Sequence, residues 1–162
     1  MLEPNRTVVI EIFNKKIFEL NLNKNERNIT FFEELDIAVI QINDLKELCI
    51  SVKFLEIDLN YKKGYDIYLN THIFILGYPL RDSVESSPGK ISKISDNELW
   101  HNCHTDRGSS GSPIILVSNL SVIGIHKAGL KNAQMNLGTF LGKFLMKKST
   151  TKIIIIMKIM VL

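Results

Sequence analysis

The residues with the clearest chemical potential lie at positions 105–113, where the chain reads Thr-Asp-Arg-Gly-Ser-Ser-Gly-Ser-Pro. A nucleophilic serine needs an exposed hydroxyl on a tight turn, with backbone N–H groups directed at the oxygen of the attacked carbonyl. Gly108 and Gly111 permit such a turn. A flexible glycine–serine loop would share this composition, but it would not explain the apolar strand expected at 114–117. We therefore predict that Ser110 is a nucleophile and that the N–H groups of Gly108 and Ser110 form an oxyanion hole.

Short apolar and β-branched runs, separated by turn residues, predict the strands that must position this loop. Many strands of this length and spacing are typical of an all-β barrel or sandwich. Helical periodicity is weak, and its best candidate is a short helix at 139–148 near the C-terminus. The expected strands cover residues 7–13, 16–22, 35–42, 48–57, 72–76, 90–94, 113–117 and 122–126.

The loop resembles the nucleophile motif of the chymotrypsin-like serine proteases, in the form found in their glutamyl endopeptidase and HtrA-like branches. Three other segments resemble that family in the same order along the chain. Residues 36–39 are similar to the strand that carries the catalytic aspartate, the Gly-Tyr-Pro at 77–79 to the start of the second barrel, and residues 122–126 to the strand lining the specificity pocket. The resemblance implies peptide-bond hydrolysis through an acyl-enzyme, a polypeptide substrate, and no metal or cofactor. It also implies that Asp36 orients the catalytic base.

The same resemblance implies a double β-barrel whose N-terminal barrel is truncated. Residues 1–58 would be the remnant of that barrel, 59–70 a linker, and 71–148 the C-terminal barrel. Residues 149–162 would be an apolar tail, and its apolar stretch, which starts at Lys152, is about half as long as the ~20 residues of a membrane-spanning helix. We interpret this tail as an apolar strand or a mispredicted gene end, and we expect no membrane partner.

A general base is missing from the expected place. In this family the catalytic histidine precedes the aspartate, whereas all four histidines here follow Asp36: His72, His101, His104 and His126. Two hypotheses follow. The chain is either part of an enzyme whose histidine segment lies upstream of Met1, or a non-catalytic homologue that binds peptides in the former cleft. The intact motif around Ser110 favours the first, although removing the base of one protease lowers turnover by about 10⁶, so the chain as written is expected to be inactive.

The resemblance to glutamyl endopeptidases also implies a preference for an acidic side chain before the scissile bond. His126 and Thr105 would recognise that carboxylate, because imidazole and hydroxyl groups both donate hydrogen bonds. A histidine at position 104, at the expected base of the specificity pocket, argues against a preference for lysine or arginine. An ordinary strand histidine with a satisfied hydrogen bond is the alternative interpretation of His126.

Composition excludes several other classes of protein. The net charge is only +3, and no basic stripe interleaved with aromatic residues indicates a nucleic-acid surface. Cys49 and Cys103 supply neither a disulfide framework nor a zinc site, which slightly favours a reducing compartment such as the cytoplasm. The N-terminal residues do not have the pattern of a secretory signal.

Overall fold

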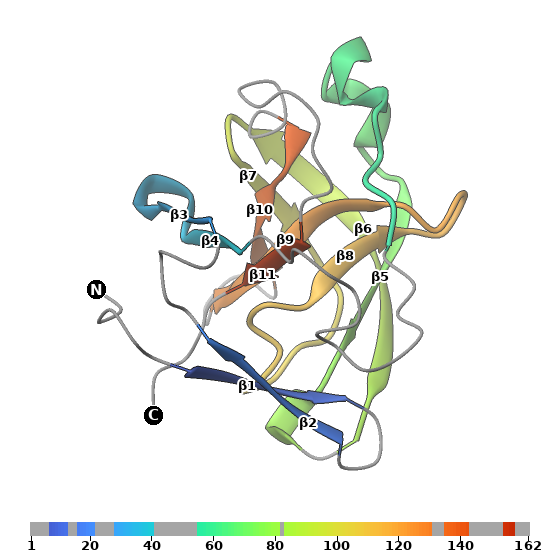
Figure 1. Cartoon of the computed structure of the whole chain (residues 1–162). Coiled ribbons are helices and arrows are strands. Elements are labelled where there is room, and N and C mark those ends of the chain that lie inside the picture. The colour runs from blue at the N-terminus through green and yellow to red at the C-terminus, as the bar shows by residue number, and fades with distance from the viewer. Residues whose placement is uncertain are drawn as a thin grey trace. The chain divides into compact units, whose positions relative to one another are not determined.

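The computed structural model describes residues 7–12, 16–21, 28–40, 55–81, 83–130, 135–142 and 154–157. The chain forms two compact units, which are described separately: Met1–Phe54 together with Thr151–Leu162, and Leu55–Thr150. Strands and short 3-10 turns make up most of the regular structure of the described residues (Figure 1). Within those ranges, no helix is both long enough and apolar enough to cross a membrane.

The first unit contains an antiparallel hairpin and a three-stranded sheet. The hairpin pairs β1 (Thr7–Ile12) with β2 (Lys16–Asn21). In the sheet, β4 lies between the other two strands, and all four of its residues are buried. The apolar tail supplies one edge strand, as its strand interpretation predicted. The strands of this sheet, in spatial order, are β11 (Ile154–Met157), β4 (Ile37–Ile40) and β3 (Ile29–Phe32).

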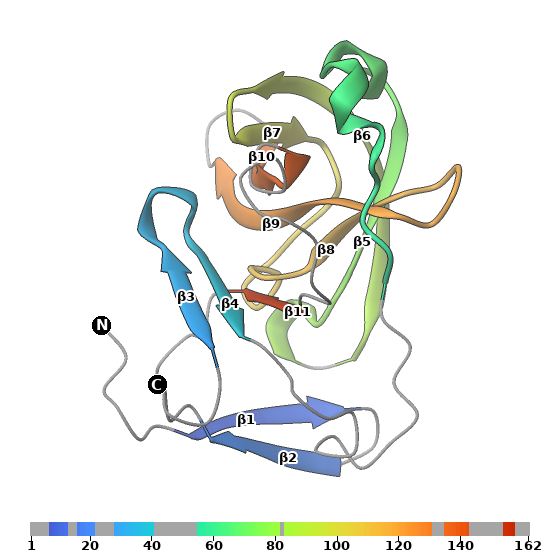
Figure 2. The ribbon, with the colours of Figure 1, turned by 45° about the horizontal axis from the view of Figure 1, so that its top comes forward.

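The second unit is built on a closed barrel of six antiparallel strands. The long strand β6 pairs with β5 through its first half and with β7 through its second, so it bends around the barrel (Figure 2). This barrel confirms the predicted all-β class. In spatial order the strands are β10 (Met135–Phe140), β7 (Glu98–His101), β6 (Glu85–Ser95), β5 (His72–Gly77), β8 (Pro113–Leu116) and β9 (Val122–Leu130).

Two expected elements differ from the structure. A helix does not begin at residue 139, because β10 continues through Phe140 and pairs there with Gly124 of β9. Gly142, inside the predicted range, is helical, and the rest of that predicted helix, from residue 143, lies outside the described residues. The strand predicted at 48–57 is described only at its end, where Ile57 forms an isolated parallel bridge with Val122.

The segment expected to link two barrels packs against the barrel core. It contains two 3-10 turns, η3 (Asn60–Lys63) and η4 (Asp66–Tyr68). Tyr61 and Tyr68 are buried in the main apolar cluster, where the ring of Tyr68 meets Phe140 edge-on. The fully buried members of this cluster include Ile73, Ile91, Leu99 and Ile114 from the strands, and Cys103 from the loop after β7.

A buried carboxylate fastens this segment to the turn between β8 and β9. Asp58 accepts hydrogen bonds from the Tyr68 hydroxyl, and from the backbone N–H and side-chain amide of Asn60, both at 3.0 Å. The Asn119 amide and the Ser121 hydroxyl also donate to it, at 3.2 and 3.4 Å. Burial alone would raise the pKa of Asp58, but these donors outweigh it and hold the pKa below its usual value.

Candidate active site

The loop predicted to carry a nucleophile, residues 104–112 and called the nucleophile loop below for that prediction, turns sharply at its two glycines. Gly108 has φ +94° and Gly111 has φ +104°, a region that is strained for residues with a Cβ. The loop is also fixed to β9, since the Gly111 N–H donates to the His126 carbonyl and the His126 N–H to the Ser112 carbonyl, both at 2.9 Å. Ser110 is half-buried between the two glycines, so the barrel strands hold this serine on a rigid turn.

The hydroxyl of Ser110 donates to the carbonyl of Lys127 on β9, at 3.0 Å. Among the described residues, no histidine nitrogen is hydrogen-bonded to this hydroxyl. The N–H groups of Gly108 and Ser110, which were predicted to form the oxyanion hole, donate to no acceptor within the described ranges. These two donors are therefore available to a bound molecule.

The end of β5 and the turn after it support the nucleophile loop from one side. A Cβ on Gly77 would overlap the Ser112 hydroxyl and would lie 3.1 Å from its Cβ, so any larger residue would have to displace the Ser112 side chain. The Leu80 N–H donates to the carbonyl of Arg107 at 2.5 Å. The Gly-Tyr-Pro segment that carried part of the family resemblance is thus in contact with the loop that carries Ser110.

Two buried histidines lie next to each other behind the loop. His101 on β7 and His126 on β9 are almost fully buried, and the Nε2 of His101 lies 3.3 Å from the Nδ1 of His126. Burial lowers the pKa of His101 to about 3, with the neighbouring His126 adding to the effect, and lowers that of His126 to about 4. Both rings are therefore neutral at pH 7.

Hydrogen bonding assigns the tautomers of this pair. The backbone N–H of Cys103 donates to the Nδ1 of His101 at 3.3 Å. In a neutral imidazole the other nitrogen carries the proton, so His101 donates from Nε2 to the Nδ1 of His126. The proton of His126 is then on Nε2, which makes that atom a hydrogen-bond donor.

Thr105 is held by the neighbouring strand. Its hydroxyl donates to the side-chain carbonyl of Asn136 on β10 at 3.0 Å, and the amide of Asn136 donates to the Cys103 carbonyl at 2.5 Å. The Thr105 hydroxyl must therefore break its hydrogen bond to Asn136 before it can donate to a ligand.

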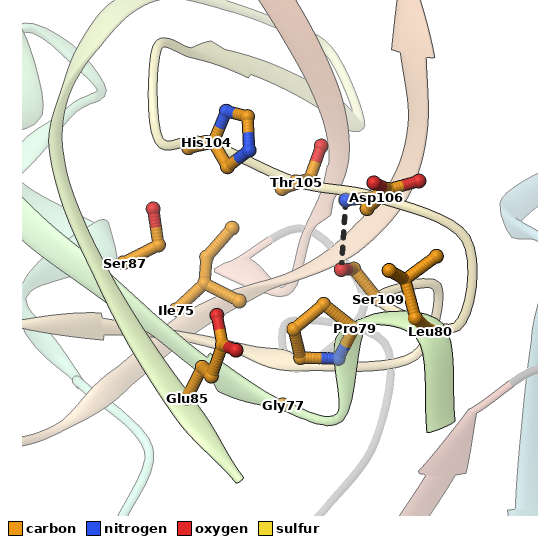
Figure 3. A pocket seen from close by; sticks show the side chains of 10 residues that line it. All are labelled: Ile75, Gly77, Pro79, Leu80, Glu85, Ser87, His104, Thr105, Asp106 and Ser109. Atoms are coloured by element: carbon orange, nitrogen blue, oxygen red, sulfur yellow. Dashed lines mark hydrogen bonds between the residues drawn. The ribbon is translucent and has the colours of Figure 1, made fainter. Parts of the chain in front are cut away.

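A cavity of about 240 Å³ lies between β5, β6 and the nucleophile loop (Figure 3). It brings together His104 and Thr105, two of the three residues predicted to line the specificity pocket, but neither His126 nor Ser110 lines it. Glu85 and Asp106 lie in its wall, and the buried Ser109 hydroxyl there accepts from the Asp106 N–H at 3.2 Å.

Asp36 lies in the first unit, at the point where the 3-10 turn η1 (Glu33–Leu35) passes into β4. It has a left-handed backbone (φ 54°, ψ 42°), and its N–H donates to the Glu33 carbonyl at 3.1 Å. Its side chain is exposed, whereas the strand that follows is buried. The strand expected at 35–42 therefore begins only at Ile37, and Asp36 lies in the turn before it.

The chain belongs to the trypsin-like peptidase domain family, which matches residues 4–125. It is similar in fold to the active form of the Rv3671c protease from M. tuberculosis (16% identity, 86% of this chain and 61% of that one, TM-score 0.63). The serine endoprotease from Yersinia pestis (16% identity, 87% and 46%, TM-score 0.61) is also similar. A Glu endopeptidase in complex with MPD shares 22% identity over 68% of this chain and 51% of its own, with a TM-score of 0.50. No curated protein matches the sequence.

The chain thus spans between 46% and 61% of the length of these solved structures. Sequence reasoning placed Ser110 on a tight glycine turn, as the structure has it, but it missed the contact of His101 with His126. The signal was weak, because His101 ends a four-residue strand that was not predicted. Only the pairing of β7 and β9 with β10 brings the two rings together.

Proposed function

We propose that this chain is the major part of a serine endopeptidase in which Ser110 is the nucleophile. The observation that carries the proposal is the turn itself: a half-buried serine between two glycines of positive φ, next to two N–H groups that have no acceptor among the described residues. Membership of the trypsin-like peptidase family supports it.

The proposed reaction begins when Ser110 Oγ adds to the peptide carbonyl carbon while its proton passes to a histidine base. The negative charge develops on the carbonyl oxygen, where the N–H groups of Gly108 and Ser110 stabilise it. Collapse expels the amine, which takes the proton from the imidazolium, and leaves an acyl group on Ser110. Water then hydrolyses this ester. Asp36 is proposed to orient the base and to stabilise its cation.

The base is proposed to come from outside this chain's own four histidines. Ser110 donates to the Lys127 carbonyl instead of to an imidazole, while His101 and His126 are buried against each other. The test is an N-terminally extended form that adds a histidine-bearing segment. With an activated ester it should release one leaving group per chain in a burst and should carry the acyl group on Ser110, whereas Ser110→Ala should show no burst. A full burst from the chain alone would contradict this assignment of the base.

The second candidate function is a non-catalytic homologue that binds peptides. The bond from Ser110 to Lys127 favours it, because it leaves the serine unactivated. In that case the extended form would show no burst, and the chain would bind peptides equally well with and without Ser110→Ala.

We further propose that the side chain before the scissile bond is acidic and that His126 recognises it. The Nε2–H of His126 is a donor in the tautomer that its hydrogen bonds define, and the Thr105 hydroxyl is a second donor if it leaves Asn136. His104 is proposed to line the wall behind this pocket. Peptide profiling of the extended form should show glutamate or aspartate before the cut, and a preference for lysine or arginine would rule out this role.

A further inference from the structure

We infer that the backbone of Leu80 is a positioning element for the oxyanion hole, because it sets the orientation of the peptide bond between Arg107 and Gly108. The inference rests on the proposed function of Ser110, and it adds a residue that lies outside the nucleophile loop. It starts from an unusual backbone at Leu80.

Leu80 has φ 55° and ψ 9°, inside the short turn Pro79–Arg81. This left-handed region disfavours a residue with a Cβ, and leucine has no short polar side chain to compensate. Its side chain is 66% exposed, so burial of the leucine does not repay the unfavourable conformation. A strained, exposed, apolar residue calls for another explanation, and such residues are concentrated at functional sites.

The conformation directs the N–H of Leu80 to the carbonyl of Arg107, at 2.5 Å. Arg107 itself is exposed on the nucleophile loop, so this bond connects the turn after β5 to the residue before Gly108. The neighbouring close approach of Gly77 to Ser112 keeps the same two segments together.

The consequence follows from the geometry of the peptide group. The Arg107 carbonyl and the Gly108 N–H belong to one planar unit, and no peptide bond of the described residues is cis. In a trans peptide these two groups point in opposite directions. Because the carbonyl is held toward Leu80, the N–H of Gly108 must point away from it, and it has no acceptor within the described ranges.

A rotation of this peptide by half a turn would present a carbonyl oxygen where the N–H now points. An oxyanion would then meet a partial negative charge instead of a donor. Gly108, at φ +94°, has no Cβ to oppose such a rotation. The hydrogen bond from Leu80 therefore favours the orientation that a developing oxyanion needs.

The test replaces the amide between Pro79 and Leu80 with an ester, by incorporating the α-hydroxy analogue of leucine, which exchanges the N–H for an oxygen and keeps the side chain. Leu80→Ala is the matched control, since it changes the side chain and keeps the donor. The readouts are the Gly108 amide resonance and the affinities of two peptides that differ only in ending with a carboxylate or a carboxamide. Thermal unfolding of each variant reports whether it is folded.

We expect the ester variant to shift the Gly108 amide resonance and to lose about tenfold in the preference for the carboxylate, a difference of about 1.4 kcal/mol. Carboxamide binding should stay within about twofold, and Leu80→Ala should resemble the parent. Leu80→Gly, which relieves the strain and retains the donor, should also resemble the parent. An unchanged Gly108 resonance in the ester variant, or an equal loss for both peptides, would overturn the inference. If the unmodified chain binds both peptides equally well, the proposed oxyanion hole is contradicted. The Gly108 resonance then still tests whether the Leu80 N–H orients the peptide bond between Arg107 and Gly108.

Discussion

The rings of His101 and His126 meet edge-on, at an interplanar angle of 71° and a centroid separation of 5.3 Å, with both side chains shielded from solvent. A chain of donors runs from the Cys103 N–H through His101 to His126 and leaves one proton on the far nitrogen of His126. This arrangement needs both β7, which carries His101, and β9, which carries His126. The pair affects both the stability of the barrel and the chemistry proposed for its pocket.

The first prediction is that the barrel loses stability in mild acid. The pKa values of about 3 for His101 and about 4 for His126 lie below the value of ~6.5 in an unfolded chain. Between pH 6.5 and 4 the unfolded state therefore binds protons that the folded state does not, so the free energy of unfolding falls as the pH falls. Each histidine contributes a slope of about 1.4 kcal/mol per pH unit.

Urea unfolding at pH 7.5 and 5.0 checks this, with an expected loss of more than about 2 kcal/mol. His101→Gln should reduce the dependence on pH, whereas His104→Gln, at an exposed position, should leave it unchanged. A stability that is the same at both pH values would contradict the buried, neutral pair. The Asp58 network cannot produce the same curve, because its pKa is lowered from 3.8 and its stabilisation is lost only in stronger acid.

The second prediction concerns Asp58 itself. Asp58→Asn should lower the free energy of unfolding by about 2–3 kcal/mol, because the amide group turns a donor toward groups that already donate. Tyr68→Phe removes one donor and keeps the carboxylate, so its effect should be smaller. Urea unfolding of both variants at pH 7 gives the comparison, and equal losses would show that the carboxylate is not the organising group.

The third prediction concerns the approach of β5 to the nucleophile loop. Gly77→Ala should destabilise the second unit by about 1–3 kcal/mol, because its Cβ would overlap the Ser112 hydroxyl. It should also change the amide resonances of Gly108 and Ser110. Ser112→Ala removes the overlapping oxygen, so in combination with Gly77→Ala it should restore part of the stability. If the double variant loses as much stability as the two single variants together, the Cβ at position 77 and the Ser112 hydroxyl do not overlap.

The sequence predicted those strands and turns whose residue pattern is local to the segment. Short apolar and β-branched runs predicted β5, β8 and β9, and the glycines around Ser110 predicted its turn. β10 was missed because Met-Asn-Leu-Gly-Thr-Phe has a weak strand pattern, and its pairing with β7 and β9 overrides that weakness.

The site was predicted less completely than the fold. The contact of His101 with His126 and the bond from Leu80 to Arg107 both join segments that are far apart in the chain. Neither leaves a local pattern, because each depends on the register of the closed barrel. The strained backbone of Leu80 is also invisible in a sequence that places leucine, and not glycine, at that position.

The most direct test of the central claim, that Ser110 is a nucleophile without its base, is labelling by a fluorophosphonate probe, followed by mapping of the modified residue. Ser110 Oγ would displace fluoride from phosphorus, and the rate depends on removal of its proton. The chain alone should label slowly, and the histidine-extended form should label much faster, at Ser110 in both cases. Ser110→Ala should abolish the reaction and Ser109→Ala should not. Rapid labelling of the chain alone, or modification at another residue, would contradict the account.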